Sequence, residues 1–176
     1  KFFKTGDSRW PARMAMTKSA TASMTAIQRL LAEEDVNIKD FFVAGASKRG
    51  WTTWTTAAVD DTVRAIAPIV IDLLNIEPSF EHHWRVYGFW SPAIQDYVDM
   101  STTDWWRSAE SHALFDLVAP FSYRDRYTMP KLILNAAGDE FFVPTSSHFY
   151  FDKLPDEKYL RYVPNVGHGI DDSCLL

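Results

Sequence analysis

The sequence predicts an α/β fold in which a parallel sheet carries helices on both faces. Short apolar runs that are typical of buried strands alternate with segments of helical periodicity. These runs are continuously hydrophobic rather than alternating, as expected for strands buried on both sides. With 176 residues, 47% of them hydrophobic and 15% aromatic, the chain is long enough for one domain with a sizeable core.

The first expected element is a helix that begins near Pro11, because proline is tolerated in a first helical turn. Its apolar residues recur at steps of three and four and should share one face: Met16, Ala20, Met24, Ile27 and Leu31. The helix should end in the acidic run 33–35. A buried strand is then expected at 41–44, closed by Gly45.

A second helix should follow this strand at once. One of its faces is expected to hold four residues: Trp51, Trp54, Thr55 and Ala58. Further strands are predicted at 65–71, 131–136 and 159–163, although Pro68 weakens the middle of the first of these. In the last of these strands, apolar and polar residues alternate, so it should be less buried than the others.

The composition excludes several classes of protein. The formal net charge is −5, and lysine and arginine form no basic stripe, so no nucleic-acid partner is expected. No apolar run approaches the roughly 18–20 residues that a membrane span needs. Residues 1–7 lack the apolar core of a signal peptide. The lone Cys174 is interpreted as an incidental thiol, and no oligomeric state follows from the sequence.

The segment Gly-Ala-Ser-Lys-Arg-Gly at 45–50 lies where a predicted strand turns into a helix. A serine on such a turn presents its hydroxyl at the carboxyl end of the sheet, so Ser47 is a candidate nucleophile. The backbone N–H of Lys48 would open the helix and point at a developing oxyanion. The common pattern is G-x-S-x-G, whereas here Arg49 replaces the second glycine and Gly50 comes one step later. A plain strand–turn–helix corner is the alternative.

A candidate general base follows the last predicted strand. His168 is flanked by glycines on the loop after residues 159–163. Neutral imidazole near pH 7 can take a proton from a serine and return it to a leaving group. A solvated loop histidine is the alternative, but the position at a strand's carboxyl end favours the base.

The expected acid is Asp139, which follows the strand at 131–136 and would orient the imidazole. Glu140 beside it, and Asp72 at the end of the preceding strand, are alternative acids. The chain order Ser, Asp, His is the order of the α/β-hydrolase triad. The sequence therefore predicts a serine hydrolase that forms an acyl-serine intermediate.

The segment at about 73–128 is too long for a connecting helix alone and is rich in aromatic residues. It is expected to form a cap over the active site, with at least one of four tryptophans lining the pocket: Trp84, Trp90, Trp105 and Trp106. The alternative is that they form the cap's own small core. The adjacent His82 and His83 have no spaced partner, so neither a metal nor a cofactor is expected.

Several segments resemble the PhoPQ-activated pathogenicity-related family: W-P at 10–11, M-T-K-S-A at 16–20, G-A-S-K-R-G-W-T-T-W at 45–54, I-A-P-I-V-I-D at 66–72, W-S-P-A-I-Q-D-Y at 90–97 and G-D-E-F-F-V-P at 138–144. The resemblance implies an α/β-hydrolase fold, a triad and a secreted or periplasmic location, and some relatives look like growth-regulating signals. The serine turn is also similar in spacing to G-C-S-R-x-G of glucuronoyl esterases. That similarity implies that the Lys48 side chain helps bind an oxyanion, whereas a solvent-facing lysine is the alternative.

The chain is expected to be the C-terminal portion of an α/β-hydrolase whose N-terminal strands are missing. The serine is already residue 47, preceded by one strand and one helix, and the loop that supplies a second oxyanion N–H normally comes earlier. The chain alone should therefore be inactive and poorly soluble. The leading interpretation is hydrolysis of an ester or amide in a small-molecule or peptide substrate. The alternative is a secreted signalling or virulence-associated protein whose catalytic activity is dispensable.

Overall fold

The computed structural model describes residues 1–170, which build one four-stranded parallel sheet in the order β1-β2-β3-β4. The strands are β1 Phe41–Ala46, β2 Val63–Ile69, β3 Lys131–Ala136 and β4 Lys158–Val163. The α-helices are α1 Phe2–Thr5, α2 Ala12–Ala32, α3 Lys48–Ala57, α4 Ile76–Tyr87, α5 Gln95–Asp99 and α6 Ala109–Val118. Short 3-10 helices are η1 Pro92–Ile94, η2 Thr102–Asp104, η3 Pro120–Arg126, η4 Ser146–Phe149 and η5 Phe151–Lys153. The expectation for Cys174 concerns a position outside the described residues.

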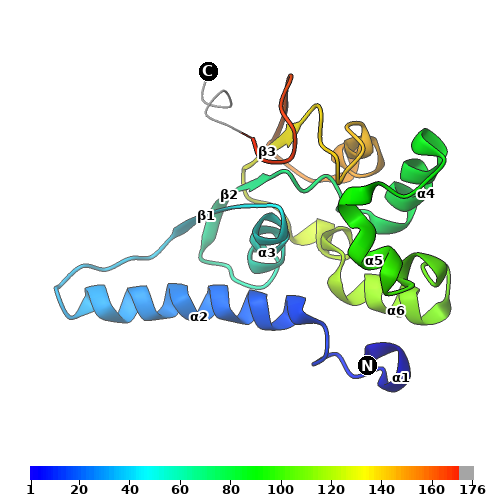
Figure 1. Ribbon diagram of the computed structural model, residues 1–176. Coiled ribbons are helices and arrows are strands. Elements are labelled where there is room, and N and C mark those ends of the chain that lie inside the picture. The colour runs from blue at the N-terminus through cyan, green and yellow to red at the C-terminus, as the bar shows by residue number, and fades with distance from the viewer. Residues whose placement is uncertain (171–176) are drawn as a thin grey trace.

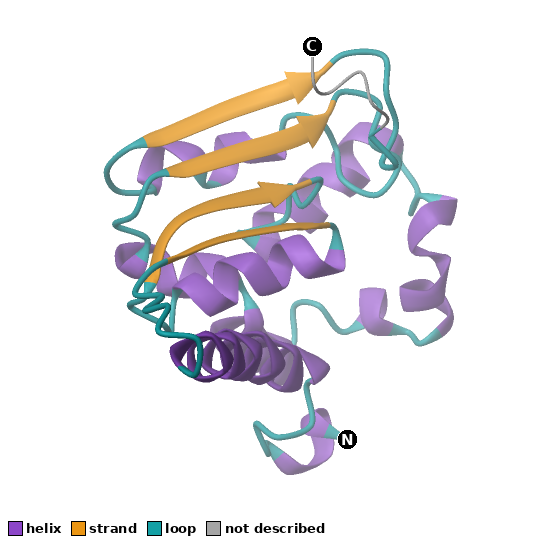
Figure 2. Cartoon of the chain, turned by 90° about the vertical axis from the view of Figure 1, so that its left-hand side faces the viewer, coloured by secondary structure: helices purple, strands orange, loops and turns teal. Residues whose placement is uncertain are grey.

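All four strands point the same way, so their carboxyl ends meet at one edge of the sheet (Figure 2). The predicted α/β class with a parallel sheet is confirmed, and β3 has the predicted bounds. This edge positions the site, because the loops that follow β1, β2, β3 and β4 all begin there.

The second strand begins and ends two residues earlier than predicted. It ends at Ile69 because Val70 adopts a φ of 43°, which a β-branched residue rarely adopts and which breaks the extended run. Pro68 is tolerated inside the strand. Backbone groups alternate in direction along a strand, and the N–H of Ile66 donates toward β3, so the missing N–H of Pro68 also faces β3. The β2–β3 register is interrupted there, while the pairing with β1 continues.

Helix α3 packs directly against β1 and β2, and α2 packs on α3 (Figure 1). The four residues predicted for one face of α3 are all buried: Trp51, Trp54, Thr55 and Ala58. The predicted face of α2 is only partly correct. Met24 joins the core, but Ile27 is 45% exposed. Thr17 is buried instead, and its hydroxyl lies 2.6 Å from that of Thr55 on α3.

Within residues 1–170, the helices cover one face of the sheet, so the predicted cover on both faces is not met there. In Figure 2 the helices lie behind and below the strands. Phe41 and Val43 of β1 pack on the core, whereas Phe42 between them is 66% exposed. Leu132 of β3 is paired in register with Tyr159 of β4, and both are exposed.

The residues between β2 and β3, here called the β2–β3 segment (70–130), form α4, α5, α6 and three short 3-10 helices. These helices gather on the right of Figure 1, beyond the carboxyl ends of the strands. In the part of the chain that the structure describes, no helix is long and apolar enough to cross a membrane.

Candidate active site

The nucleophile candidate lies on the strained turn between β1 and α3. Ser47 has φ 54° and ψ −122°, an uncommon conformation for a residue with a side chain. Such backbone strain costs on the order of 1–3 kcal/mol and clusters at functional sites. The turn is held from both sides, since the N–H of Ser47 donates to the Ile69 carbonyl and the Ser47 carbonyl accepts from the N–H of Trp51.

The two glycines of the turn allow its backbone to close tightly. A Cβ on Gly45 would lie 2.8 Å from the carbonyl oxygen of Arg49, and one on Gly50 would lie 2.8 Å from that of Gly45. Both distances are too short for any side chain. The unusual spacing of the motif therefore has a physical reason: at Gly50, α3 lies so close to the carbonyls of Gly45 and Ile69 that a Cβ does not fit.

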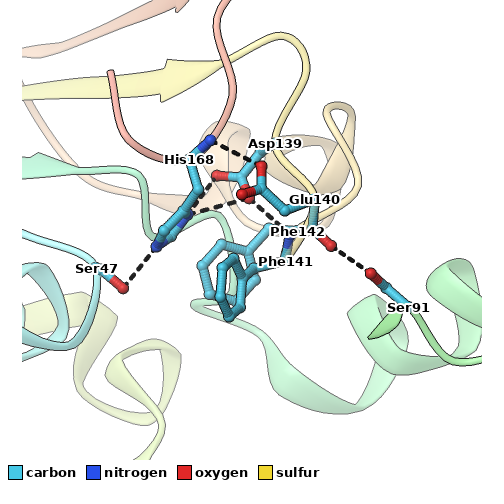
Figure 3. Close-up of polar contacts among 7 residues, drawn as sticks. All are labelled: Ser47, Ser91, Asp139, Glu140, Phe141, Phe142 and His168. Atoms are coloured by element: carbon cyan, nitrogen blue, oxygen red, sulfur yellow. Dashed lines mark hydrogen bonds and ion pairs between the residues drawn. The ribbon is translucent and has the colours of Figure 1, made fainter. Parts of the chain in front are cut away.

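The His168 ring bridges Ser47 and Asp139 (Figure 3). Its Nε2 lies 2.7 Å from the Ser47 hydroxyl oxygen, and its Nδ1 lies 3.0 and 3.1 Å from the two carboxylate oxygens of Asp139. Because an ionised carboxylate only accepts, this arrangement selects the tautomer in which Nδ1–H donates to Asp139. Nε2 is then free to accept the serine proton.

Asp139 is the acid that contacts the imidazole. Its side chain is almost fully buried, and its Oδ1 also accepts from the backbone N–H groups of Phe141 and Phe142 at 2.8 and 3.1 Å. Burial raises the pKa of Asp139 above its ordinary value, while the hydrogen bonds from His168 and these N–H groups act in the opposite direction. Three donors therefore fix the carboxylate's orientation.

Phe141 and Phe142 are site residues that sequence reasoning missed. Their ring centroids lie 4.3 and 5.7 Å from that of His168, and both rings appear beside the imidazole in Figure 3. They immediately follow Asp139 and Glu140, and this position was the only indication in the sequence. Their rings contact the imidazole, and their backbone N–H groups donate to the Asp139 carboxylate.

Glu140, an alternative acid, binds the backbone of His168 rather than its ring. Its Oε2 accepts from the His168 N–H at 2.9 Å, and this bond lowers the pKa of Glu140. Its own carbonyl accepts from the Ser91 hydroxyl at 2.7 Å, which ties the β2–β3 segment to this loop. Glu140 thus positions the loop that carries the histidine.

Asp72, the other alternative acid, belongs to a separate cluster. It is 2% exposed and accepts hydrogen bonds from the hydroxyls of Tyr150 and Tyr162. Burial raises the pKa of Asp72 to about 6, against the lowering effect of these two bonds. The Tyr162 hydroxyl also contacts Ser147. No contact between Asp72 and the His168 ring occurs among the described residues.

A cavity of about 590 Å³ opens at Ser47. Its walls combine the turn and α3 with the β2–β3 segment and the loop after β3. Most of the lining is apolar, including Trp51, Phe80, Phe115, Phe141 and Phe142. Lys48, the first residue of α3, also lines it with an exposed side chain. Because the first N–H groups of a helix have no intrahelical acceptor, the Lys48 N–H is available beside Ser47.

The predicted tryptophan lining is wrong: among the described residues that line this cavity, none is Trp84, Trp90, Trp105 or Trp106. Trp90 and Trp106 pack against the outer side of Phe80, which itself reaches the cavity. The Trp84 ring contacts that of Trp90, with centroids 5.2 Å apart, and Trp84 and Trp105 are about half exposed. The phenylalanines of the segment form the wall, and the tryptophans support them or face outward.

The adjacent histidines of the β2–β3 segment have separate partners. The Nε2 of His83 accepts from the N–H of Ser91 at 3.0 Å, and burial lowers the pKa of His83. His82 lies 2.8 Å from the Thr145 hydroxyl. Within residues 1–170, no group of three or more histidine, cysteine or acidic side chains gathers into a metal site.

The sequence model of one protein family, described as PhoPQ-activated pathogenicity-related protein, matches residues 1–174. A similar relative is Autocrine proliferation repressor protein A of Dictyostelium discoideum, which is 42% identical over 168 residues. That match covers 94% of this chain and 34% of the relative, so the chain spans about a third of its length.

Two solved structures share the fold. An acetyl xylan esterase from Paenibacillus sp. R4 superposes with a TM-score of 0.61 at 16% identity, covering 82% of this chain and 45% of the esterase. The acylaminoacyl peptidase of Pyrococcus horikoshii superposes with a TM-score of 0.58 at 15% identity, covering 87% of this chain and 23% of the peptidase. These similarities show the α/β-hydrolase fold.

Proposed function

The chain belongs to the PhoPQ-activated pathogenicity-related protein family, and on this premise we propose that it hydrolyses an ester or amide bond through an acyl-serine intermediate. One observation carries the proposal. The hydroxyl of Ser47, on a strained turn, lies 2.7 Å from a histidine ring whose other nitrogen lies on a buried carboxylate. A protein without this chemistry has no need to maintain that geometry at the mouth of a cavity.

In the proposed reaction, Ser47 Oγ attacks the substrate carbonyl while its proton moves to Nε2 of His168. Asp139 stabilises the imidazolium that forms, and the imidazolium then protonates the leaving alcohol or amine. The acyl group remains on Ser47. Water attacks it by the same sequence of proton transfers, with His168 as base, and releases the acid and the free serine.

The negative oxygen of the tetrahedral intermediate would bind at the start of α3. The Lys48 N–H, in the first turn of α3, would donate to it, and the positive end of the helix dipole favours an anion there. The Lys48 side chain lines the same cavity and would add positive charge. Removing one such donor typically costs about 2.7–4 kcal/mol of transition-state stabilisation.

The largely apolar lining of the cavity favours a substrate whose acyl or peptidyl group is itself largely apolar. We propose that the β2–β3 segment acts as a cap, because Phe80, Ile94 and Phe115 from this segment line the cavity together with Ser47. A cap that excludes water strengthens the electrostatic interactions within the site. The proposed proton transfers use the side chains of Ser47, His168 and Asp139, and no cofactor takes part in them.

The decisive test is labelling of the full-length protein with a fluorophosphonate probe, which reacts with activated serines. We expect one labelled peptide, containing Ser47, and no label on S47A. The matched control is S79A, which removes another serine hydroxyl from the same cavity wall and should keep the label. A folded wild-type protein that takes no label, or equal labelling of S47A, would contradict the proposal.

The second candidate function is a secreted signal carried on a hydrolase scaffold. The name of the Dictyostelium relative, Autocrine proliferation repressor protein A, favours it. The two functions are separated by S47A: a signalling role predicts that the purified variant still represses or alters growth when added to cells. An enzymatic role predicts that this effect disappears together with the probe label.

A further inference from the structure

The cavity that opens at Ser47 contains a guanidinium group with no assigned role. Arg13, in the first turn of α2, is half-buried and lines the cavity wall. Its guanidinium lies over the Trp51 ring, 4.0 Å from the centroid, and its Nη1 donates to the Lys48 carbonyl at 3.0 Å. Both contacts are with α3, so the charged group is held next to the residue that follows Ser47.

This cation has no carboxylate partner among the described residues, since no carboxylate oxygen lies within 4.0 Å of it. Two acidic residues also line the cavity. Asp72 is bound by its two tyrosines, and one carboxylate oxygen of Asp96 accepts from the N–H of Tyr97. Arg64, in contrast, is paired with Asp40 at 2.7 Å, and Arg107 with Glu81 at 2.8 Å.

The physical setting of Arg13 favours an anionic ligand. Burial lowers the pKa of Arg13, yet a guanidinium stays charged at any physiological pH. A partly desolvated cation without a counter-charge is costly, and a ligand carboxylate would compensate it. Only Nη1 of Arg13 donates a hydrogen bond to another described residue, so Nε and Nη2 have no partner among residues 1–170. These two donors match a carboxylate in a bidentate geometry.

We propose that Arg13 is a specificity-determining residue that binds a carboxylate of the substrate. The ligand class is an ester or amide with an apolar body, for the phenylalanine-lined wall, and a carboxylate at a distance from the reacting carbonyl. This inference rests on the proposed hydrolase function and narrows its substrate class.

The alternative is that Arg13 has a purely structural role and only holds α2 against α3, as a clamp. That contact already has a buried bond, between the hydroxyls of Thr17 and Thr55 at 2.6 Å. A clamp predicts that replacing Arg13 alters all substrates alike. A carboxylate subsite predicts a selective effect on anionic substrates.

The first test compares two esters of equal chain length in the full-length protein: the 4-nitrophenyl monoester of glutaric acid, which is anionic, and 4-nitrophenyl pentanoate. The readout is the ratio of their kcat/KM values. R13Q should lower the anionic-to-neutral ratio roughly 10- to 100-fold, as expected for a lost charge-assisted hydrogen bond. R13K should restore part of it, because lysine keeps the charge but lacks the planar fork. The control R9Q, at an exposed arginine paired with Asp7, should leave the ratio unchanged.

The second test measures binding without turnover, so that it does not depend on the hydrolase proposal. In S47A, calorimetric titration with 5-phenylpentanoate should give binding that weakens with added salt, and 5-phenylpentanamide should bind at least about tenfold more weakly. S47A/R13Q should lose this preference. If the glutamine variant does not unfold cooperatively, S47A/R13M, which also removes the charge, is measured in its place. An unchanged preference in either double variant overturns the subsite. Selective binding in S47A without any turnover by the wild type overturns the hydrolase and retains the subsite.

Discussion

Asp139 and Asp72 are two buried carboxylates that follow neighbouring strands at one edge of the sheet, and they differ in their hydrogen-bond donors. Asp139 is 4% exposed and receives the His168 ring and two backbone N–H groups. Asp72 is 2% exposed and receives the hydroxyls of Tyr150 and Tyr162. Equal burial and equivalent positions thus give two different electrostatic settings.

The donor decides what each carboxylate can do. Burial raises the pKa values of Tyr150 and Tyr162 above their ordinary range, so both phenols keep their protons and act only as fixed donors. An imidazole, in contrast, takes up a proton near neutral pH, and the carboxylate beside it stabilises the charge that appears. Asp139 is therefore suited to a reaction and Asp72 to a structural role.

The largest expected effect separates the two carboxylates by activity. D139N should lower kcat on the order of 10⁴-fold, because an asparagine amide would favour the wrong imidazole tautomer. D72N should lower it far less, since it does not contact the ring. Steady-state kinetics of both variants on one ester, with circular dichroism to verify folding, give the comparison. If kcat fell equally in the two variants, both carboxylates would contribute to catalysis and the proposed difference between them would be wrong.

The next effect concerns stability as a function of pH. Burial raises the pKa of Asp72 from its ordinary 3.8 to about 6, so ionising it costs more in the folded state than in the unfolded state. This contribution to stability is fully present below pH 3.8 and is lost as the pH rises through about 6. Between pH 4 and 7, the free energy of unfolding of the wild type should fall by about 2.4 kcal/mol relative to D72N.

Urea unfolding across that pH range measures the difference. D61N, at an exposed aspartate on the turn before β2, is the matched control and should follow the wild type at each pH. A wild-type curve parallel to that of D72N would show that Asp72 titrates at its ordinary pKa.

A smaller effect tests the phenol donors themselves. Y162F removes one hydrogen bond to the Asp72 carboxylate and should destabilise the fold by about 2 kcal/mol at pH 7, where the carboxylate is ionised. The loss should shrink at pH 5, because protonated Asp72 needs fewer donors. Y159F is the control on the same strand: Tyr159 is 55% exposed, and its removal should change stability by less than about 0.5 kcal/mol. A loss for Y162F that is equal at both pH values would remove Asp72 from the explanation.

The parts of the site that the sequence could predict follow from chain order and strand ends. Ser47 comes directly after β1, Asp139 three residues after β3 and His168 five residues after β4. A parallel sheet brings such positions together without knowledge of side-chain packing. Chain order and strand ends did not decide which carboxylate is the acid. Three carboxylates lie within reach of the same edge, and only the geometry of the loops shows which one contacts the ring.

The wall of the cavity could not be predicted because it depends on tertiary packing. The many aromatic residues of the β2–β3 segment indicate that it packs against something, but they do not show which of its rings face the cavity. Phe80 faces the cavity while Trp90 and Trp106 pack behind it. The early end of β2 has a similar cause. Val70 has high strand propensity, yet its positive φ is imposed by the turn toward the site, against local preference.

The smallest expected effect concerns Glu140, the neighbour of Asp139, which extends the comparison to a third carboxylate. Its Oε2 accepts the backbone N–H of His168, whereas Asp139 accepts from the ring of the same residue. E140Q keeps an acceptor oxygen of the same reach and loses only the charge, so kcat should fall by no more than about threefold. E140A removes the acceptor, and a loss of one hydrogen bond corresponds to a fall of roughly 2- to 12-fold.

The kinetic signature distinguishes this positioning role from that of an acid. Glu140 binds a backbone N–H that does not titrate, and it acts on the His168 ring only through the weaker Coulombic interaction of its exposed charge. E140Q should therefore change the pH dependence of kcat/KM only slightly, whereas loss of an acid on the ring would change it strongly. The measurement is a pH–rate profile of wild type, E140Q and E140A on one neutral ester. A strongly shifted profile, or a loss for E140Q as deep as that for D139N, would show that the His168 ring uses both carboxylates. The division of labour between the two neighbouring acids would then be wrong.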